Sequence, residues 1–138
     1  ARTLHLLESA GVLLAVATGK SRRGLEQVLG HHGLDHLFVS LQTADDNPSK
    51  PHPAMLERAI GETGSRPEET AFVGDTTFDM MMARAVGARG LGVAHGYHAR
   101  EDLLAHGAER NEMLAVAQRE LQVLVRVQVG PEFGRRLD

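Results

Sequence analysis

Apolar and polar residues follow two different periods along the chain, and each change of period marks the boundary of a predicted element. Apolar residues recurring about every 3.6 positions indicate helices, whereas short continuous apolar runs between glycines and polar residues indicate buried strands. The helical pattern covers residues 2–10, 21–32, 51–60, 78–86 and 100–105. The strand pattern covers residues 12–17, 37–41, 71–73 and 91–94. The predicted order is therefore one helix followed by four strand–helix units.

Helices that connect successive strands in this way imply parallel neighbours and right-handed crossovers. We therefore predict an α/β fold of Rossmann-like type, with three α/β/α layers and a mainly parallel sheet. Two prolines, Pro51 and Pro53, suit the first turn of the third helix, where a missing N–H is tolerated. In the fourth helix the pattern predicts a buried face made of four apolar residues, Phe78, Met81, Met82 and Val86.

The last thirty residues do not continue this rhythm. Between residues 121 and 129 apolar and polar side chains mostly alternate, a period of two that predicts a strand with one wet face. We therefore divide the chain into a core over residues 1–108 and an atypical tail over residues 109–138, with a helix followed by a strand at 121–129. Residues 130–138 are polar and predicted to fray.

Composition narrows the function classes. The 138 residues are 42% hydrophobic and 24% charged, which suits one globular domain. A formal charge of −3 predicts no nucleic-acid partner, and no apolar run is long enough to predict a membrane span. The absence of cysteine excludes disulfides and thiolate chemistry, and it fits a cytoplasmic protein.

Polar residues gather where the predicted strands end. In a parallel sheet these ends share one edge, and ligands bind beyond it. The four strand ends are Thr18-Gly19-Lys20, residues 43–46, Gly74-Asp75 and His95-Gly96. A hydroxyl, a glycine amide, carboxylates and a nearby lysine suit an anion such as phosphate together with a hard divalent cation, Mg²⁺.

The Gly19-Lys20-Ser21 segment also suggests a nucleotide-binding P-loop. That loop requires a glycine five positions before Gly19, where this chain has Leu14. The preceding residues are also too apolar to wrap backbone amides around phosphates. We therefore reject the P-loop interpretation.

Three segments together resemble motifs II, III and IV of the haloacid dehalogenase-like hydrolases, most closely the phosphoglycolate phosphatase-like branch. They are residues 15–19 (AVATG), 47–53 (NPSKPHP) and 72–79 (FVGDTTFD). The segments occur in the family's order, each at the end of a predicted strand or the start of a helix. The resemblance covers residues 1 to about 108.

This resemblance implies a role for each matching residue. Thr18 and Gly19 would hold phosphoryl oxygens through a hydroxyl and an amide, and Lys50 would neutralise the charge of the nucleophile and the phosphoryl group. Asp75 would bind Mg²⁺, and Asp79 would support the metal site from nearby. These roles agree with phosphoryl transfer, which depends mainly on positioning and on cations around the equatorial oxygens.

The chain also departs from the family pattern. The family attacks phosphorus with the first aspartate of an Asp-x-Asp-Gly strand, and no such sequence occurs here. Asp45 and Asp46 are adjacent and cannot replace that pair. The helical cap that this branch inserts after the nucleophile strand is absent as well. We therefore expect a sheet that lacks its nucleophile strand. Either the neighbouring strands close the gap directly, or the tail strand at 121–129 occupies it.

Each candidate residue also has an ordinary structural explanation. Asp75 could be an N-cap, and Asp79 could complement a helix dipole. Lys50 could be a solvated loop charge, and Thr18 a plain strand-end hydroxyl. Arg22, early in a helix, could attract an anionic substrate or simply be a solvated surface charge. The presence of the other candidates in the same pattern favours function for Thr18, Lys50 and Asp75 and leaves Asp79 balanced.

We therefore expect a Mg²⁺-dependent phosphatase core that acts on a small phosphorylated metabolite through an aspartyl-phosphate. Without the nucleophile, the 138-residue chain is expected to be inactive. The alternatives are a non-enzymatic Rossmann-like module that binds an anion or a partner, and a dehalogenase of the same family. Substrate identity and oligomeric state stay open.

Overall fold

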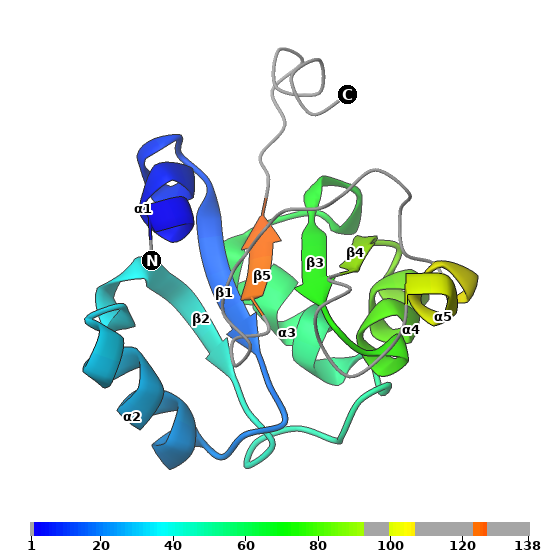
Figure 1. The fold of residues 1–138 in the computed structure, drawn as a ribbon, viewed down its shortest axis with the longest axis horizontal. Helices are drawn as coiled ribbons and strands as arrows, with labels where there is room; N and C mark the ends of the chain where they lie inside the picture. The colour runs from blue at the N-terminus through cyan, green and yellow to red at the C-terminus, as the bar shows by residue number, and fades with distance from the viewer. Residues whose placement is uncertain (1, 93–99, 107–122, 127–138) are drawn as a thin grey trace.

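The structure, a computed structural model, describes residues 2–92, 100–106 and 123–126. Helices and strands alternate along the chain in the predicted order (Figure 1). The helices are α1 (Arg2–Ser9), α2 (Arg22–His32), α3 (Ala54–Thr63), α4 (Thr77–Val86) and α5 (Arg100–Ala105), with short 3₁₀ turns at Asp35–Leu37 and Pro67–Glu69. The strands are β1 (Leu13–Ala17), β2 (Phe38–Gln42), β3 (Ala71–Gly74), β4 (Arg89–Gly92) and β5 (Val123–Arg126).

Local signals in the sequence explain where α2 begins and ends. The Ser21 hydroxyl accepts a hydrogen bond from the Gly24 amide and so satisfies a free donor of the first turn. At the other end Gly33 adopts φ 64°, a left-handed conformation that glycine reaches without a Cβ penalty. The helix therefore spans the residues that the apolar pattern predicted.

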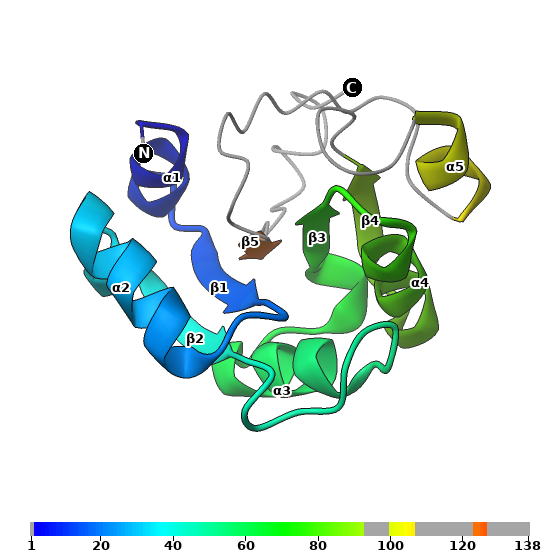
Figure 2. The same cartoon turned by 60° about the horizontal axis from the view of Figure 1, so that its bottom comes forward.

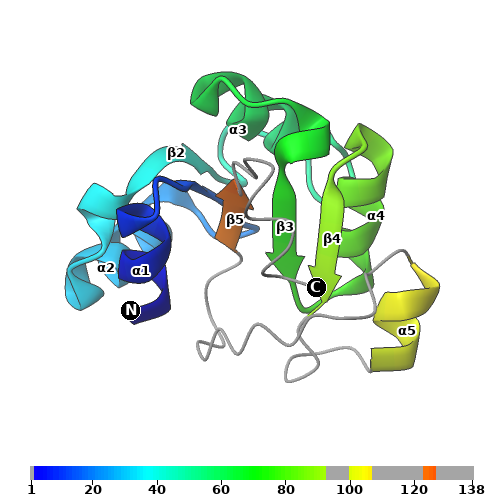
Figure 3. The same cartoon turned by 90° about the horizontal axis from the view of Figure 1, so that it is seen from above.

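The five strands form one sheet in the order β2-β1-β5-β3-β4. β1 pairs in parallel with β2, and β3 pairs in parallel with β4. β5 lies between these two pairs and is antiparallel to both β1 and β3 (Figure 3). The mainly parallel α/β prediction is confirmed, and of the two ways to fill the gap the structure shows occupation by the tail strand.

Alternating side chains of the sheet divide the core into two clusters. Leu14 and Val16 of β1 pack with α1 and α2, whereas Ala15 and Ala17 pack with α3 and α4. The sheet therefore has helices on both faces, as the three-layer prediction requires (Figure 2). All four of these β1 side chains are fully buried. Among the described residues, no helix has both the length and the apolar character to cross a membrane.

Two helix predictions need correction. Helix α3 begins at Ala54 with Pro53 as its N-cap, so Pro51 lies before the helix and not in its first turn. In α4 the buried apolar side chains are Met80, Met82 and Ala83, whereas Phe78 and Met81 are exposed. The prediction holds for Met82, which is buried, and for Val86, which packs against the core, but not for Phe78 and Met81, because three consecutive methionines leave the phase of the face undecided.

Strand boundaries differ slightly as well. β4 starts at Arg89, two residues before the prediction, because an exposed arginine and a glycine precede its apolar part. The predicted strand at 121–129 is seen over Val123–Arg126. Its remaining residues, the predicted tail helix and the strand end at His95-Gly96 lie outside the described residues.

Candidate functional site

The sheet register brings the ends of β1 and β3 to the same level. Ala15 of β1 and Phe72 of β3 both pair with Leu124 of β5. Because β1 and β3 run in the same direction, Thr18 and Asp75, each three residues further along, lie at the same height on either side of the β5 position. The sequence prediction that these two strand ends share one edge of the sheet is therefore confirmed.

The end of β2 joins the same edge. The Thr18 amide donates to the Gln42 carbonyl at 3.0 Å, and the Ala44 amide donates to the Lys20 carbonyl at 3.1 Å. These bonds tie the segment after β1 to the segment after β2. The loop that begins at residue 43 and leads to Lys50 therefore starts beside Thr18.

Lys50 crosses from this loop to α4 and pairs with Asp79. The Lys50 Nζ lies 2.8 Å from Asp79 Oδ1, and the two side chains are 9% and 0% exposed. Nζ also lies 5.3 Å from the centroid of the Phe72 ring, within range of a cation–π contact. Lys50 is thus a buried charge, and the interpretation as a solvated loop lysine is wrong.

Burial has a direct electrostatic effect on Lys50. Desolvation disfavours the ammonium ion and lowers the pKa of Lys50, while the charges of Asp79 and Asp75 act in the opposite direction. Lys50 is therefore held by Asp79 of α4, and Asp75 adds a smaller electrostatic effect in the same direction.

Asp79 has both carboxylate oxygens engaged by the protein. Oδ1 accepts from Lys50, and Oδ2 accepts from the Thr76 hydroxyl at 2.8 Å and from the Thr76 amide at 3.2 Å. In return the Asp79 amide donates to the Thr76 hydroxyl, which completes a capping box at the start of α4. The N-cap of α4 is thus Thr76 and not Asp75, which corrects the alternative given for Asp75.

Gly74 has a role that the sequence reasoning missed. A Cβ at this position would lie 2.6 Å from Cγ of Asp79, closer than real Cβ atoms approach a neighbour. Only glycine leaves room for the Asp79 carboxylate against the end of β3. No motif in the sequence signals this contact, because it depends on how α4 packs against the end of β3.

Thr18 is buried, and its hydroxyl oxygen accepts a hydrogen bond from the Lys20 amide at 3.1 Å. This bond shapes the turn after β1, as expected of an ordinary strand-end hydroxyl, and does not use the hydroxyl hydrogen. Gly19 and Lys20 in the same turn are exposed. The Gly19 amide and the Thr18 hydroxyl therefore belong to a turn at the open side of the sheet edge.

Arg22 does not face solvent as a bare cation. Its guanidinium group donates to the Leu41 carbonyl at 3.0 Å and to Asp46 at 3.1 Å, and its amide donates to Asp45 at 2.9 Å. Asp45 and Asp46 are therefore engaged in holding the loop after β2. Arg22 thus links the start of α2 to the end of β2 and the following loop, while its side chain stays 41% exposed as the surface-charge interpretation expects.

The donor set allows a test of whether Mg²⁺ suits this edge. Asp75 is half-buried and follows the end of β3, and an oxygen ligand of this kind suits Mg²⁺, which commonly takes one or two carboxylates together with phosphate and water oxygens. Asp79 accepts hydrogen bonds from Lys50 and Thr76 through its two carboxylate oxygens, an arrangement that suits support of the metal site from nearby. Within the described ranges no cluster of three His, Asp or Glu side chains could hold a metal. The fit is therefore to a Mg²⁺ ion with Asp75 as its carboxylate ligand from this part of the chain.

Comparison with known proteins identifies the family and the fold. Residues 1–93 match the model of the haloacid dehalogenase-like hydrolase family. A phosphoglycolate phosphatase of Haemophilus influenzae is 39% identical over 97 residues, which cover 70% of this chain and 43% of that protein. The pyrophosphatase PpaX of Bacillus pumilus is 34% identical over 105 residues, which cover 75% of this chain and 49% of that protein.

Solved structures show the same fold. A predicted phosphoglycolate phosphatase from Haemophilus somnus superposes with a TM-score of 0.70 at 32% identity, covering 76% of this chain and 47% of the other. A haloacid dehalogenase-like hydrolase from Bacteroides fragilis superposes with a TM-score of 0.75 at 29% identity, covering 79% and 52%. The chain spans about half the length of these proteins or less.

The fold and the strand-end site together define a Rossmann-like α/β protein with a buried lysine and two aspartates at the carboxyl edge of its sheet. This chain belongs to the haloacid dehalogenase-like hydrolase family.

Proposed function

We propose that this chain is the phosphoryl-binding part of a Mg²⁺-dependent phosphatase that hydrolyses a small phosphomonoester through an aspartyl-phosphate. The curated relatives named as phosphatases support this proposal. The observation that carries it is the Lys50–Asp79 pair. Its ammonium group is largely buried and lies 2.8 Å from Asp79. Lys50 belongs to the loop after β2, whose last residue, Gln42, accepts a hydrogen bond from the Thr18 amide.

Each residue would contribute by position and charge. The Gly19 amide and the Thr18 hydroxyl would donate to phosphoryl oxygens, and Lys50 would place a point charge beside them. Asp79 would keep Lys50 in place through the short ion pair, and so would act through Lys50 and not on the substrate. Such fixed donors stabilise the charge that spreads over equatorial oxygens during phosphoryl transfer.

Asp75 would hold the Mg²⁺ ion at this edge. When bound, the ion supplies positive charge that offsets the negative charge of the phosphoryl oxygens. Asp79 would support the metal site indirectly, through its contacts with Lys50 and Thr76.

We further propose that the 138-residue chain does not hydrolyse phosphomonoesters by itself. Covalent phosphoryl transfer to an aspartate requires a carboxylate positioned for attack, with a general acid or base close by. The chain contains no Asp-x-Asp sequence, and Asp45 and Asp46 are committed to Arg22. The expected behaviour of the isolated chain is binding of the phosphoryl group without turnover.

A binding experiment tests the first part of the proposal. The chain has two lysines, the exposed Lys20 and the buried Lys50, and so provides its own control. Isothermal titration calorimetry measures the affinity for inorganic phosphate in the presence of Mg²⁺. We expect Lys50→Ala to bind phosphate about tenfold or more weakly than the unmodified chain, because a charge-assisted hydrogen bond is lost. Lys20→Ala should bind nearly as the unmodified chain does.

Equal losses in the two lysine variants, or no phosphate binding by the unmodified chain, would contradict the phosphoryl site. Asp75→Asn should remove the dependence of phosphate binding on Mg²⁺. Hydrolysis of para-nitrophenyl phosphate by the pure chain in the presence of Mg²⁺ would contradict the proposed inactivity and leave the binding site standing.

A further inference from the structure

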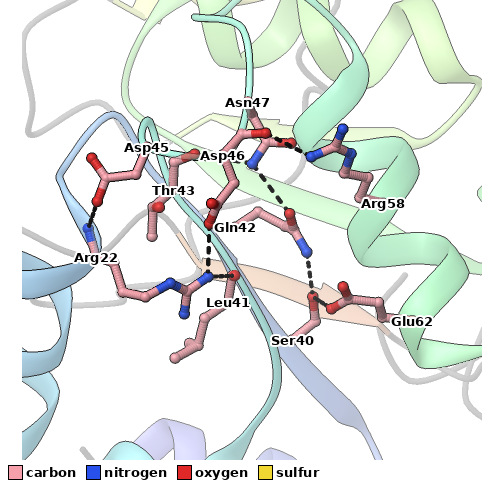
Figure 4. Close-up of polar contacts among 10 residues, drawn as sticks. All are labelled: Arg22, Ser40, Leu41, Gln42, Thr43, Asp45, Asp46, Asn47, Arg58 and Glu62. Carbon is pink, nitrogen blue, oxygen red and sulfur yellow. Dashed lines mark hydrogen bonds and ion pairs between the residues drawn. The ribbon is translucent and has the colours of Figure 1, made fainter.

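The loop between β2 and α3 is held by a network of polar side chains that the proposed phosphoryl chemistry does not use (Figure 4). At its centre Asn47 donates through Nδ2 to the Thr43 carbonyl at 2.9 Å and to Gln42 Oε1 at 3.2 Å. The first bond closes the turn after β2, and the second ties that turn to the strand. Lys50 follows three residues later on the same loop.

The orientation of the Asn47 amide is set by its partners. A carbonyl oxygen can only accept, so Nδ2 and not Oδ1 must face Thr43. Oδ1 of Asn47 is buried and has no hydrogen-bond partner among the described residues. A buried amide with an unsatisfied acceptor is unfavourable. The two hydrogen bonds from Asn47 Nδ2 to the loop therefore offset the unfavourable burial of its Oδ1.

These bonds continue in one direction toward α3. Gln42 accepts from Asn47 and donates through Nε2 to the Ser40 hydroxyl at 3.1 Å, and that hydroxyl donates to Glu62 Oε2 at 2.5 Å. In this series of hydrogen bonds each donor faces an acceptor. The last acceptor is the Glu62 carboxylate, and hydrogen bonds to a charged group are stronger. Figure 4 shows this line running from the loop across β2 to Glu62. The loop is therefore anchored to two regular elements.

Two arginines also touch the loop but are less committed to it. Arg22 pairs with Asp46 at 3.1 Å, with side chains 41% and 53% exposed, and surface pairs of this kind contribute little. Arg58 donates to the Asp46 carbonyl at an exposed position. The part-buried amide of Asn47, with two bonds at the base of the turn, is the stronger restraint.

We infer that Asn47 is a positioning residue for Lys50, because its two hydrogen bonds fix the loop that carries the lysine into its pair with Asp79. The functional importance of this role rests on the proposed function, in which Lys50 binds the phosphoryl group. The geometry itself is independent of any ligand. It predicts that loss of the Asn47 donors releases Lys50 toward solvent while the fold persists.

Amine labelling of the ligand-free chain measures this directly. Lys50 and Lys20 are acetylated with a limiting reagent at neutral pH, and mass spectrometry gives the ratio of modified Lys50 to modified Lys20. The ratio is low in the unmodified chain, because the Lys50 side chain is 9% exposed. In Asn47→Ala and in Asn47→Asp, which keeps the shape but replaces the donor with an acceptor, the ratio should rise about threefold or more through local opening.

Two controls separate positioning from general destabilisation. Ser49→Ala alters an exposed side chain next to Lys50 and should leave the ratio unchanged. Ile60→Val weakens the α3 core without touching the loop network and should also leave it unchanged, although its melting temperature falls. An unchanged ratio in both Asn47 variants, or an equal rise in Ile60→Val, would overturn the inference.

The same assay distinguishes this inference from the proposed function. If phosphate with Mg²⁺ fails to protect Lys50 in the unmodified chain while the Asn47 variants still expose it, the phosphoryl site is contradicted and the positioning role is supported. If phosphate protects Lys50 and the Asn47 variants do not expose it, the phosphoryl site is supported and the positioning role of Asn47 is contradicted.

Discussion

At the scale of single residues, the site depends on how closely Asp79 approaches the end of β3. Its carboxylate lies where a Cβ on Gly74 would stand, with 2.6 Å between that Cβ and Asp79 Cγ. Asp79 is fully buried and Lys50 nearly so, which leaves neither side chain room to move away. The ion pair and the glycine therefore form one unit, and a change to either should disturb both.

We expect Gly74→Ala to lower the free energy of unfolding by about 3 kcal/mol, because the new methyl group displaces Asp79 and breaks a buried ion pair. Urea denaturation measures this change. Gly19→Ala is the matched control at the same edge, since a Cβ there meets nothing within 4 Å. It should change the stability by less than about 0.5 kcal/mol. Similar losses in the two variants would show that Asp79 can shift aside.

How much of the site could be predicted differs from residue to residue. The placement of Thr18 and Asp75 at one edge of the sheet could be predicted, because the ends of parallel strands meet there. The partner of Lys50 could not be predicted, since no local pattern links residues 50 and 79. The roles of Gly74 and Asn47 were equally invisible, because each depends on an approach between segments that only the folded chain brings together. The phosphoryl and metal roles remain predictions.

At the scale of elements, α4 illustrates how capping and function share the same atoms. The Thr76 hydroxyl accepts from the Asp79 amide at 3.2 Å and donates to Asp79 Oδ2 at 2.8 Å. It therefore starts the helix and also orients the carboxylate that holds Lys50. The apolar pattern located this helix correctly but only part of its buried face, since Met80, Met81 and Met82 fit two phases. Helix position follows from local signals, whereas the buried face is decided by packing.

We expect Thr76→Ala to reduce the free energy of unfolding by about 1–2 kcal/mol, the usual effect of losing a side-chain N-cap. The loss should be local at first, so hydrogen exchange should accelerate at the amides of the first turn, near Asp79, more than at the last turn, near Val86. Thr76→Ser keeps the hydroxyl and should behave almost as the unmodified chain. If the alanine variant keeps full protection in the first turn, Thr76 is not the N-cap that controls it.

At the scale of the whole molecule, β5 is what makes one sheet out of two parallel pairs. Leu124 pairs with Ala15 and Phe72, and Val125 pairs with Leu14 and Ala71, so two residues of β5 join both sides. The alternating pattern predicted a strand in this part of the tail. The sequence left two alternatives for its place in the sheet, because an alternating pattern predicts a strand but does not predict which strands pair with it. Buried strand edges need partners for their N–H and C=O groups. β5 meets that need at the centre of the sheet.

Replacing Leu124 by proline tests this joining role, because proline removes an amide donor and is poorly tolerated inside a sheet. We expect hydrogen-exchange protection to fall in Leu13–Ala17 of β1 and in Ala71–Gly74 of β3 together, since both strands pair with the same residues of β5. Leu124→Ala keeps the backbone donor and should retain most of that protection. If the proline and alanine variants protect both strands as well as the unmodified chain does, β1 and β3 do not depend on β5, and the central position of the tail strand is wrong.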